Sequence, residues 1–143
     1  MAKITPTLLT RIASGMMLLH AIGHTTAIVT WQNPNGKIPS DVIRKMQEAH
    51  FLFGGQDATM AKFFSGHGYA GTILLLLIVT LLWVISSWPG KKATGILWVI
   101  GISICALSVD ELIYFFPMAV VFSLIAAVLV FVAIFQLNKT AIK

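Results

Sequence analysis

Two histidines lie four residues apart in a strongly apolar stretch near the start of the chain. His20 and His24 therefore share one face of any helix that contains them. Imidazoles at this spacing bind transition metals in zinc sites, and a buried imidazole also suits acid–base chemistry. The metalloprotease signature is absent, because no glutamate follows His20. The alternative is that each histidine only hydrogen-bonds a neighbouring helix, since polar side chains often hold apolar helices together.

Another histidine, His67, lies in the glycine-rich stretch 65–69, and the acidic residue Asp57 lies ten residues before it. His67 is expected either to complete a metal site with His20 and His24 or to act as a general base, because imidazole exchanges protons near neutral pH. The predicted catalytic set is His24, His67 and Asp57. The simpler interpretations place His67 at an ordinary glycine-rich helix start and make Asp57 the N-cap of that helix.

A wider set of polar side chains is expected to line a pocket around these histidines. Carboxylates can orient a metal-ligating histidine, and a tyrosine hydroxyl can hydrogen-bond an organic ligand. The simpler alternatives are that the acidic residues cap a helix and meet water, and that the others are interfacial residues. The predicted ligand-binding residues are His20, His24, His50, Tyr69, Asp110 and Glu111.

The composition of the chain is unlike that of a water-soluble domain. It has 143 residues, of which 57% are hydrophobic and only 10% are charged. A soluble domain carries about 25% charged residues to cover its surface. The composition therefore predicts a membrane protein. The net charge is +5, but the cations are scattered and form no basic stripe of the kind that binds nucleic acid.

Four apolar segments qualify as spans of the hydrocarbon core of a bilayer, which takes about 20 residues. Together they predict an all-α fold, namely an integral membrane four-helix bundle that forms one transmembrane domain over residues 1–143. The predicted helices cover residues 8–31, 63–88, 93–109 and 116–137.

The connections between these segments differ in length. Between the first two segments, apolar residues recur at helical spacing over 40–53, which predicts a short amphipathic helix at the membrane interface that ends at Gly54 and Gly55. Pro89 and Gly90 predict a tight turn. Residues 108–111 are expected to join the third and fourth helices with almost no loop.

The distribution of charge predicts an orientation in the membrane. The positive-inside rule places both termini in the cytoplasm, because the side that carries them also carries more cations. The alternation of the spans then brings every histidine and every carboxylate to the outer half. The cations on the side of the termini are Lys3, Arg11, Lys91, Lys92, Lys139 and Lys143, and those on the other side are Lys37, Arg44, Lys45 and Lys62.

Short motifs occur along most of the chain: Gly23-His24-Thr25, Val42 to Met46, Phe51, Gly54-Gly55, the Gly-x-Gly of residues 66–68 and Phe115-Phe116-Pro117. In this combination they resemble a family of small bacterial integral membrane proteins with no established activity. The resemblance implies a four-helix fold in the bacterial inner membrane and assigns no catalytic residue. This chain has His67 where the Gly-x-Gly motif is expected to hold an aromatic residue. A looser similarity to DoxX-like four-helix membrane proteins concerns the fold alone.

The sequence leaves three functions open. The first is a pocket, lined by histidines and carboxylates on the non-cytoplasmic side, that binds a lipophilic small molecule, a metal ion or both, with acid–base or metal-assisted catalysis as a further step. The second is a non-catalytic accessory or scaffold subunit of a larger membrane complex. The third is a small transporter built as a homo-oligomer. No cofactor is specified: a transition metal is one candidate, and a haem held by His24 and His67 ranks below it.

Overall fold

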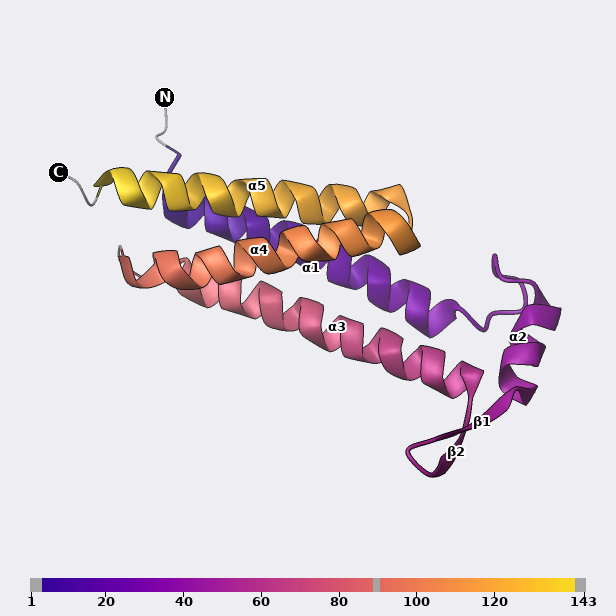
Figure 1. The fold of residues 1–143 in the computed structure, drawn as a ribbon. Coiled ribbons are helices and arrows are strands. Elements are labelled where there is room, and N and C mark those ends of the chain that lie inside the picture. Colours follow the sequence, from indigo (N-terminus) through magenta and orange to yellow (C-terminus); the bar gives the residue numbers. More distant parts are fainter. Residues whose placement is uncertain (1–3, 89–90, 141–143) are drawn as a thin grey trace. The chain divides into compact units, whose positions relative to one another are not determined.

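A computed structural model describes residues 4–88 and 91–140 of the chain. These residues form five helices and one short β-hairpin (Figure 1). The predicted turn at Pro89 and Gly90 and the terminal cations Lys3 and Lys143 lie outside the described residues. The elements, in chain order, are α1 (Pro6–Thr30), α2 (Ser40–Glu48), β1 (His50–Phe53), β2 (Gln56–Thr59), α3 (Met60–Ile85), α4 (Lys91–Tyr114) and α5 (Pro117–Thr140).

Four of the helices, α1, α3, α4 and α5, are long and apolar enough to cross a membrane. The shortest of these spans has 23 residues, and a helix of that length extends for about 35 Å, more than the roughly 30 Å of a hydrocarbon core. Proline opens both α1 and α5, at the first helical position, where its missing N–H has no helical partner to lose. The prediction of four such helices is confirmed.

The chain divides into two compact units, and the first contains parts of all four long helices. It holds residues 4–20, 75–88 and 91–140. The Ser14 hydroxyl on α1 donates a hydrogen bond to the Val79 carbonyl oxygen on α3 at 2.9 Å. Helices α4 and α5 lie side by side and run in opposite directions (Figure 1). The residues buried between these segments are mainly alanine, leucine, isoleucine and valine.

The second unit, residues 21–74, consists of the end of α1, the helix α2, the hairpin and the start of α3. Trp31, Ile43 and Ala61 form its buried apolar cluster, against which Ile38 and Met46 pack. This cluster holds the amphipathic helix α2 against the end of α1 and the beginning of α3 through Ile43, which is buried, and Met46, which is partly buried.

The amphipathic helix is shorter than predicted. It ends at Glu48, and residues 50–53, which the helical spacing assigned to it, form strand β1 instead. Phe53 pairs with Gln56 across the two residues Gly54 and Gly55, which have φ angles of 59° and 81°. A two-residue turn with positive φ at both positions closes an antiparallel hairpin, and glycine adopts it without strain. The glycine pair is therefore a hairpin turn and not a helix stop.

The third long helix extends further than predicted. The expected helix stopped at residue 109, whereas α4 continues to Tyr114, and the Phe115 N–H still donates to the Glu111 carbonyl oxygen at 2.9 Å. No glycine or proline interrupts residues 109–114, so nothing in the backbone ends the helix before Pro117 forces a new start. As a result, Glu111 lies within a helix and not in the connection between two helices.

Candidate functional site

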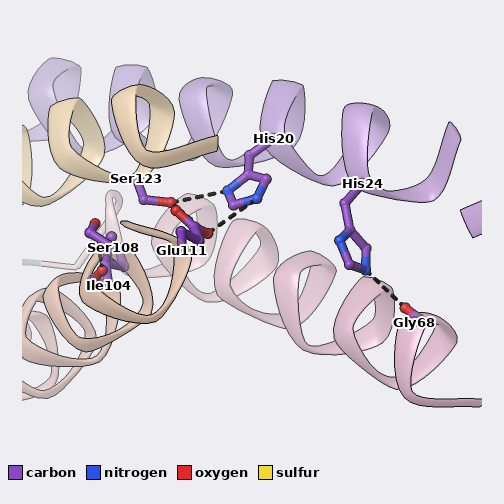
Figure 2. Close-up of polar contacts among 7 residues, drawn as sticks. All are labelled: His20, His24, Gly68, Ile104, Ser108, Glu111 and Ser123. Atoms are coloured by element: carbon purple, nitrogen blue, oxygen red, sulfur yellow. Dashed lines mark hydrogen bonds and ion pairs between the residues drawn. The ribbon is translucent and has the colours of Figure 1, made fainter. Parts of the chain in front are cut away.

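A buried polar cluster lies in the first unit and joins three helices. It consists of His20 on α1, Glu111 on α4 and Ser123 on α5 (Figure 2). His20 Nε2 lies 3.2 Å from Glu111 Oε1, and His20 Nδ1 lies 3.0 Å from Ser123 Oγ. The Ser123 hydroxyl donates to the same Glu111 oxygen at 3.2 Å. The exposed fractions of His20, Glu111 and Ser123 are 6%, 3% and 0%, so water is excluded from all three.

The positions of these residues follow from the buried face of each helix. On α4, Leu97, Ile100, Ile104 and Ser108 are buried at intervals of three or four residues, and Glu111 is the next member of that series. His20 lies three residues after the fully buried Met17 on α1 in the same way. Helical periodicity therefore places both ionisable side chains toward the neighbouring helices and not on the outer surface.

Ser123 occupies a corresponding place on α5. Ala119, Ala126 and Ala127 are buried on the same face of that helix. Small side chains allow neighbouring helices to approach closely, and a short serine side chain then reaches residues on two other helices. The serine is thus held in place by the packing around it as well as by its own hydrogen bonds.

The hydrogen bonds of the cluster limit where its protons lie. Because the single hydroxyl hydrogen of Ser123 goes to Glu111, Ser123 Oγ must accept a hydrogen bond from Nδ1–H of His20. The remaining proton lies between His20 Nε2 and Glu111 Oε1. On Nε2 it gives an imidazolium–carboxylate pair, and on Oε1 it gives two neutral groups. Both forms have zero net charge, which lowers the cost of burying them.

The second oxygen of the Glu111 carboxyl group is the unusual atom of the cluster. Oε2 is buried and has no hydrogen-bond partner among the described residues. A buried carboxyl oxygen without a partner costs free energy, on the order of 1–3 kcal/mol or more for a charged group. It is also the atom of the cluster that can accept a hydrogen bond or a proton from another molecule.

His24 has a different environment, in the second unit. Its Nε2 lies 3.0 Å from the backbone carbonyl oxygen of Gly68 on α3, to which the ring N–H donates (Figure 2). Thr25 and Thr72 connect the same two helices through a hydroxyl–hydroxyl hydrogen bond of 3.2 Å. A Cβ atom added at Gly71 would lie 3.0 Å from His24 Nε2. These contacts agree with the interpretation of His24 as a residue that holds α1 against α3.

His67 bonds to its own helix. Its Nδ1–H donates to the Phe63 carbonyl oxygen, one turn earlier on α3, at 3.1 Å, and its ring lies 4.2 Å from the Phe63 ring between centroids. The side chain is exposed. The part of the chain that the structure describes gives His67 no contact with a carboxylate.

His50 and Asp57 form an exposed pair on the hairpin. Their Nδ1 and Oδ2 atoms are 2.8 Å apart, on opposite strands. Asp57 is not the N-cap of α3, as one interpretation predicted, because it lies within β2. The side chain that caps α3 is that of Thr59, whose Oγ1 accepts the Lys62 N–H at 3.2 Å. An exposed ion pair of this kind contributes little to stability, about 0–1 kcal/mol.

Asp110 and Glu111 were both predicted to be ligand-binding residues, but one is exposed and the other is buried. Glu111 points into the first unit, while Asp110, the preceding residue on α4, is exposed. Tyr69 is half exposed on α3. Only His20 and Glu111, of the predicted ligand-binding residues in the first unit, enter the buried cluster.

No group of three or more His, Cys, Asp or Glu side chains in residues 4–88 and 91–140 is placed to hold a metal ion. Both ring nitrogens of His20 are engaged by Ser123 and Glu111. Metal binding by His20, His24 and His67 stays a prediction. Comparisons of the sequence with protein-family models, with curated proteins and with solved structures find no match.

Ser123 is the member of the cluster that sequence reasoning missed. Within the predicted span 116–137 it is the one hydroxyl-bearing residue, and Gln136 is the other polar residue. A single serine in an apolar helix was therefore a usable signal. Nothing in the sequence related it to His20, however, because the contact joins residues 103 positions apart.

Proposed function

We propose that the chain is a multi-pass membrane protein with an acid–base site inside the membrane. In this proposal the site consists of His20, Glu111 and Ser123, and it binds a lipophilic small molecule that presents a hydroxyl or N–H group. His24, His67 and Asp57, the set predicted to be catalytic, have no part in this form of the proposal, because their hydrogen bonds join them to other residues.

One observation carries the proposal, namely the unpartnered Oε2 of the buried Glu111. A molecule that donates a hydrogen bond to Oε2 would remove the cost of leaving this oxygen unsatisfied. The ligand must also be largely apolar, since the helices around the cluster present alkyl side chains and the site excludes water. A hydroxyl or N–H group on a lipophilic body meets both conditions.

The proton shared by His20 and Glu111 defines the chemistry that the site supports. In the ion-pair form, the carboxylate can take a proton from a ligand O–H at Oε2: that O–H bond breaks, and an O–H bond on Glu111 forms. The ligand becomes an anion, and the imidazolium of His20, close to the same carboxyl group, offsets the new negative charge. The reverse transfer returns the proton. The net charge of site and ligand stays constant throughout, as a low-dielectric environment requires.

We further propose a bacterial inner-membrane location with both termini in the cytoplasm. The excess of cations on the side of the termini supports this orientation. Helix α2 would then lie at the outer interface, because one of its faces carries Val42, Ile43 and Met46 and the other carries charged residues.

Analysis of co-purified molecules tests this function. The protein is isolated in a mild detergent, its solvent extract is analysed by mass spectrometry and its metal content by elemental analysis. The expected result is about one lipophilic hydroxyl or N–H compound per chain, other than bulk phospholipid, in the wild type. It should be absent from Glu111→Gln, which replaces the acceptor oxygen by an NH₂ donor of the same size.

Asp110→Asn is the matched control, since it neutralises the neighbouring, exposed carboxylate of the same helix. It should retain the compound. The proposal is wrong if the wild-type extract contains no such compound, or if Glu111→Gln retains it as well as Asp110→Asn does. A stoichiometric metal that is lost together with the His20 imidazole, in His20→Ala, would instead favour the metal-binding prediction.

A further inference from the structure

A hollow of about 540 Å³ lies in the second unit, where the ends of several elements meet. It is independent of the His20–Glu111–Ser123 cluster, because every residue that lines it belongs to residues 21–74. The polar residues of its lining are Gln32 after α1, Gln47 on α2, Thr59 at the end of β2, and Lys62, Ser65 and Tyr69 on α3.

The lining contains one cation, two amides and three hydroxyl groups, and it contains no carboxylate. Lys62 forms no ion pair with any of the described residues. Two carboxylates of the same unit are already paired, Glu48 with Arg44 at 3.8 Å and Asp57 with His50 at 2.8 Å. The positive charge of Lys62 therefore acts on whatever enters the hollow.

Two of the hydroxyl groups have a defined direction of hydrogen bonding. Ser65 Oγ accepts the indole N–H of Trp31 at 3.1 Å, and Thr59 Oγ1 accepts the backbone N–H of Lys62 at 3.2 Å. Each oxygen is thus an acceptor toward the protein, and each hydroxyl hydrogen is left to donate to another group. The Trp31 side chain is itself fixed in the buried cluster with Ile43 and Ala61. The hollow accordingly presents hydroxyl donors, one of which, Ser65, is bonded to a buried tryptophan.

We propose that this hollow binds a phosphate group. A lysine ammonium group together with several neutral N–H and O–H donors is a combination that suits phosphate oxygens, which are strong acceptors and carry negative charge. Two sources share this chemistry: the headgroup of an anionic phospholipid and a soluble phosphate compound. The phospholipid fits the fold more directly, since Lys62 lies in the first turn of a helix that can span a membrane, where headgroups would surround it.

Lipid titrations followed by native mass spectrometry test the proposal on the full-length protein in detergent. Phosphatidylglycerol is compared with diacylglycerol, which has the same acyl chains and lacks the phosphate. The wild type should bind one phosphatidylglycerol more tightly than diacylglycerol. Lys62→Gln should weaken phosphatidylglycerol binding about tenfold, since a charge-assisted hydrogen bond is worth roughly 1.5–3 kcal/mol and tenfold corresponds to about 1.4 kcal/mol. Lys45→Gln is the control, because it removes one exposed cation of the same unit that does not line the hollow.

A second pair of variants keeps the test informative if Lys62→Gln disturbs folding. Gln47→Glu places a negative charge in the lining without a change of shape and should also weaken phosphatidylglycerol binding. Gln56→Glu makes the same change on the exposed hairpin and should not. Helical circular dichroism and gel filtration confirm that each variant is folded.

Inorganic phosphate, titrated by calorimetry and in competition with phosphatidylglycerol, separates the two sources. Competition shows that the hollow takes phosphate from either source, and binding of phosphatidylglycerol without binding of inorganic phosphate identifies the lipid. The proposal fails if phosphatidylglycerol and diacylglycerol bind equally well. It also fails if Lys62→Gln and Gln47→Glu behave like Lys45→Gln and Gln56→Glu.

Discussion

At the scale of single residues, the Glu111 side chain has an environment that is unusual for a glutamate, because it is buried with one carboxyl oxygen unpartnered. Carboxylates are rarely buried in membrane-spanning helices unless they are paired or have a function. His20 and Ser123 both contact Oε1 of Glu111, and Oε2 has no partner among the described residues. A carboxyl group kept only to hold helices together would be expected to have both oxygens bonded. The unpartnered oxygen is therefore the reason to look for function here.

Removal of the carboxyl group should destabilise the protein. Glu111→Ala removes the carboxyl group that lies against His20 Nε2 and opens a cavity between helices, so we expect the free energy of unfolding to fall by about 2 kcal/mol or more. In the double variant His20→Ala/Glu111→Ala, the loss should be smaller than the sum of the single losses, by about 1 kcal/mol. Reversible unfolding in mixed detergent micelles measures these values.

Asp110→Ala serves as the control for that measurement, since the exposed Asp110 should contribute within about 0.5 kcal/mol. Equal losses for Asp110→Ala and Glu111→Ala would contradict the interpretation of Glu111 as a buried, paired group. Strict additivity of the His20 and Glu111 losses would show that the two side chains do not interact.

Much of this site could not be predicted from the sequence. His20 was singled out because a histidine in an apolar segment is costly, and Glu111 because of its charge. The sequence could not separate Glu111 from Asp110, however, because the expected helix end at residue 109 placed both in a connection. Once α4 continues past them, adjacent residues point about 100° apart, and only one of the two faces the interior. Because the end of this helix was predicted too early, the sequence did not indicate that Glu111 pairs with His20.

At the scale of elements, the long helices were predictable and the hairpin was not. Each span is marked by a run of apolar residues that no loop of a soluble protein would carry. Each strand of the hairpin has four residues, and its His50 and Phe53 continue the helical spacing that begins at Val42. The pair Gly54-Gly55 does not distinguish the two structures in the sequence, because it can end a helix or close a two-residue turn. The strand pairing in the folded chain decides between them.

The contact of α1 with α3 in the second unit depends on Gly68. A Cβ atom at this position would clash with the Ile28 side chain, lying only 2.6 Å from Cγ1, and the Gly68 carbonyl oxygen is the acceptor for His24. Gly68→Ala should therefore lower the free energy of unfolding by about 1–3 kcal/mol. The cost should be smaller in the background Ile28→Ala, which makes room for the added methyl group. Unfolding in mixed micelles measures both.

Gly66→Ala is the matched control on the same helix, because nothing lies within 4 Å of its Cβ position. Alanine favours helix over glycine by up to about 1 kcal/mol, so this variant should be neutral or more stable. If Gly68→Ala were as well tolerated as Gly66→Ala, the close approach of the two helices at this point would be refuted.

At the scale of the whole molecule, the exposed surface of the long helices is itself an argument for a membrane. In α3 the large apolar side chains Ile73, Leu74, Leu76 and Leu77 are exposed, and at most 44% of the residues in any of the four apolar windows are buried. Water would make so large an apolar surface prone to association, whereas lipid tails solvate it without cost. Polar side chains in the interior then have to form hydrogen bonds with one another. His20, Glu111 and Ser123 largely do so.

The orientation proposed for the chain in the membrane can be tested at the scale of the four spans. Four crossings return the terminus to its starting side, and six of the ten cations lie on that side. In the proposed orientation, Lys92, between the second and third spans, lies in the cytoplasm, and Gln56, between the first and second, lies outside. Cys105 is the single cysteine, so Cys105→Ala gives a background free of thiols. In that background, a membrane-impermeant maleimide applied to intact bacterial cells should label Gln56→Cys at once and Lys92→Cys only after the cells are permeabilised. The reverse pattern would place the termini outside, and labelling of both sites in intact cells would contradict the assignment of a membrane span to α3.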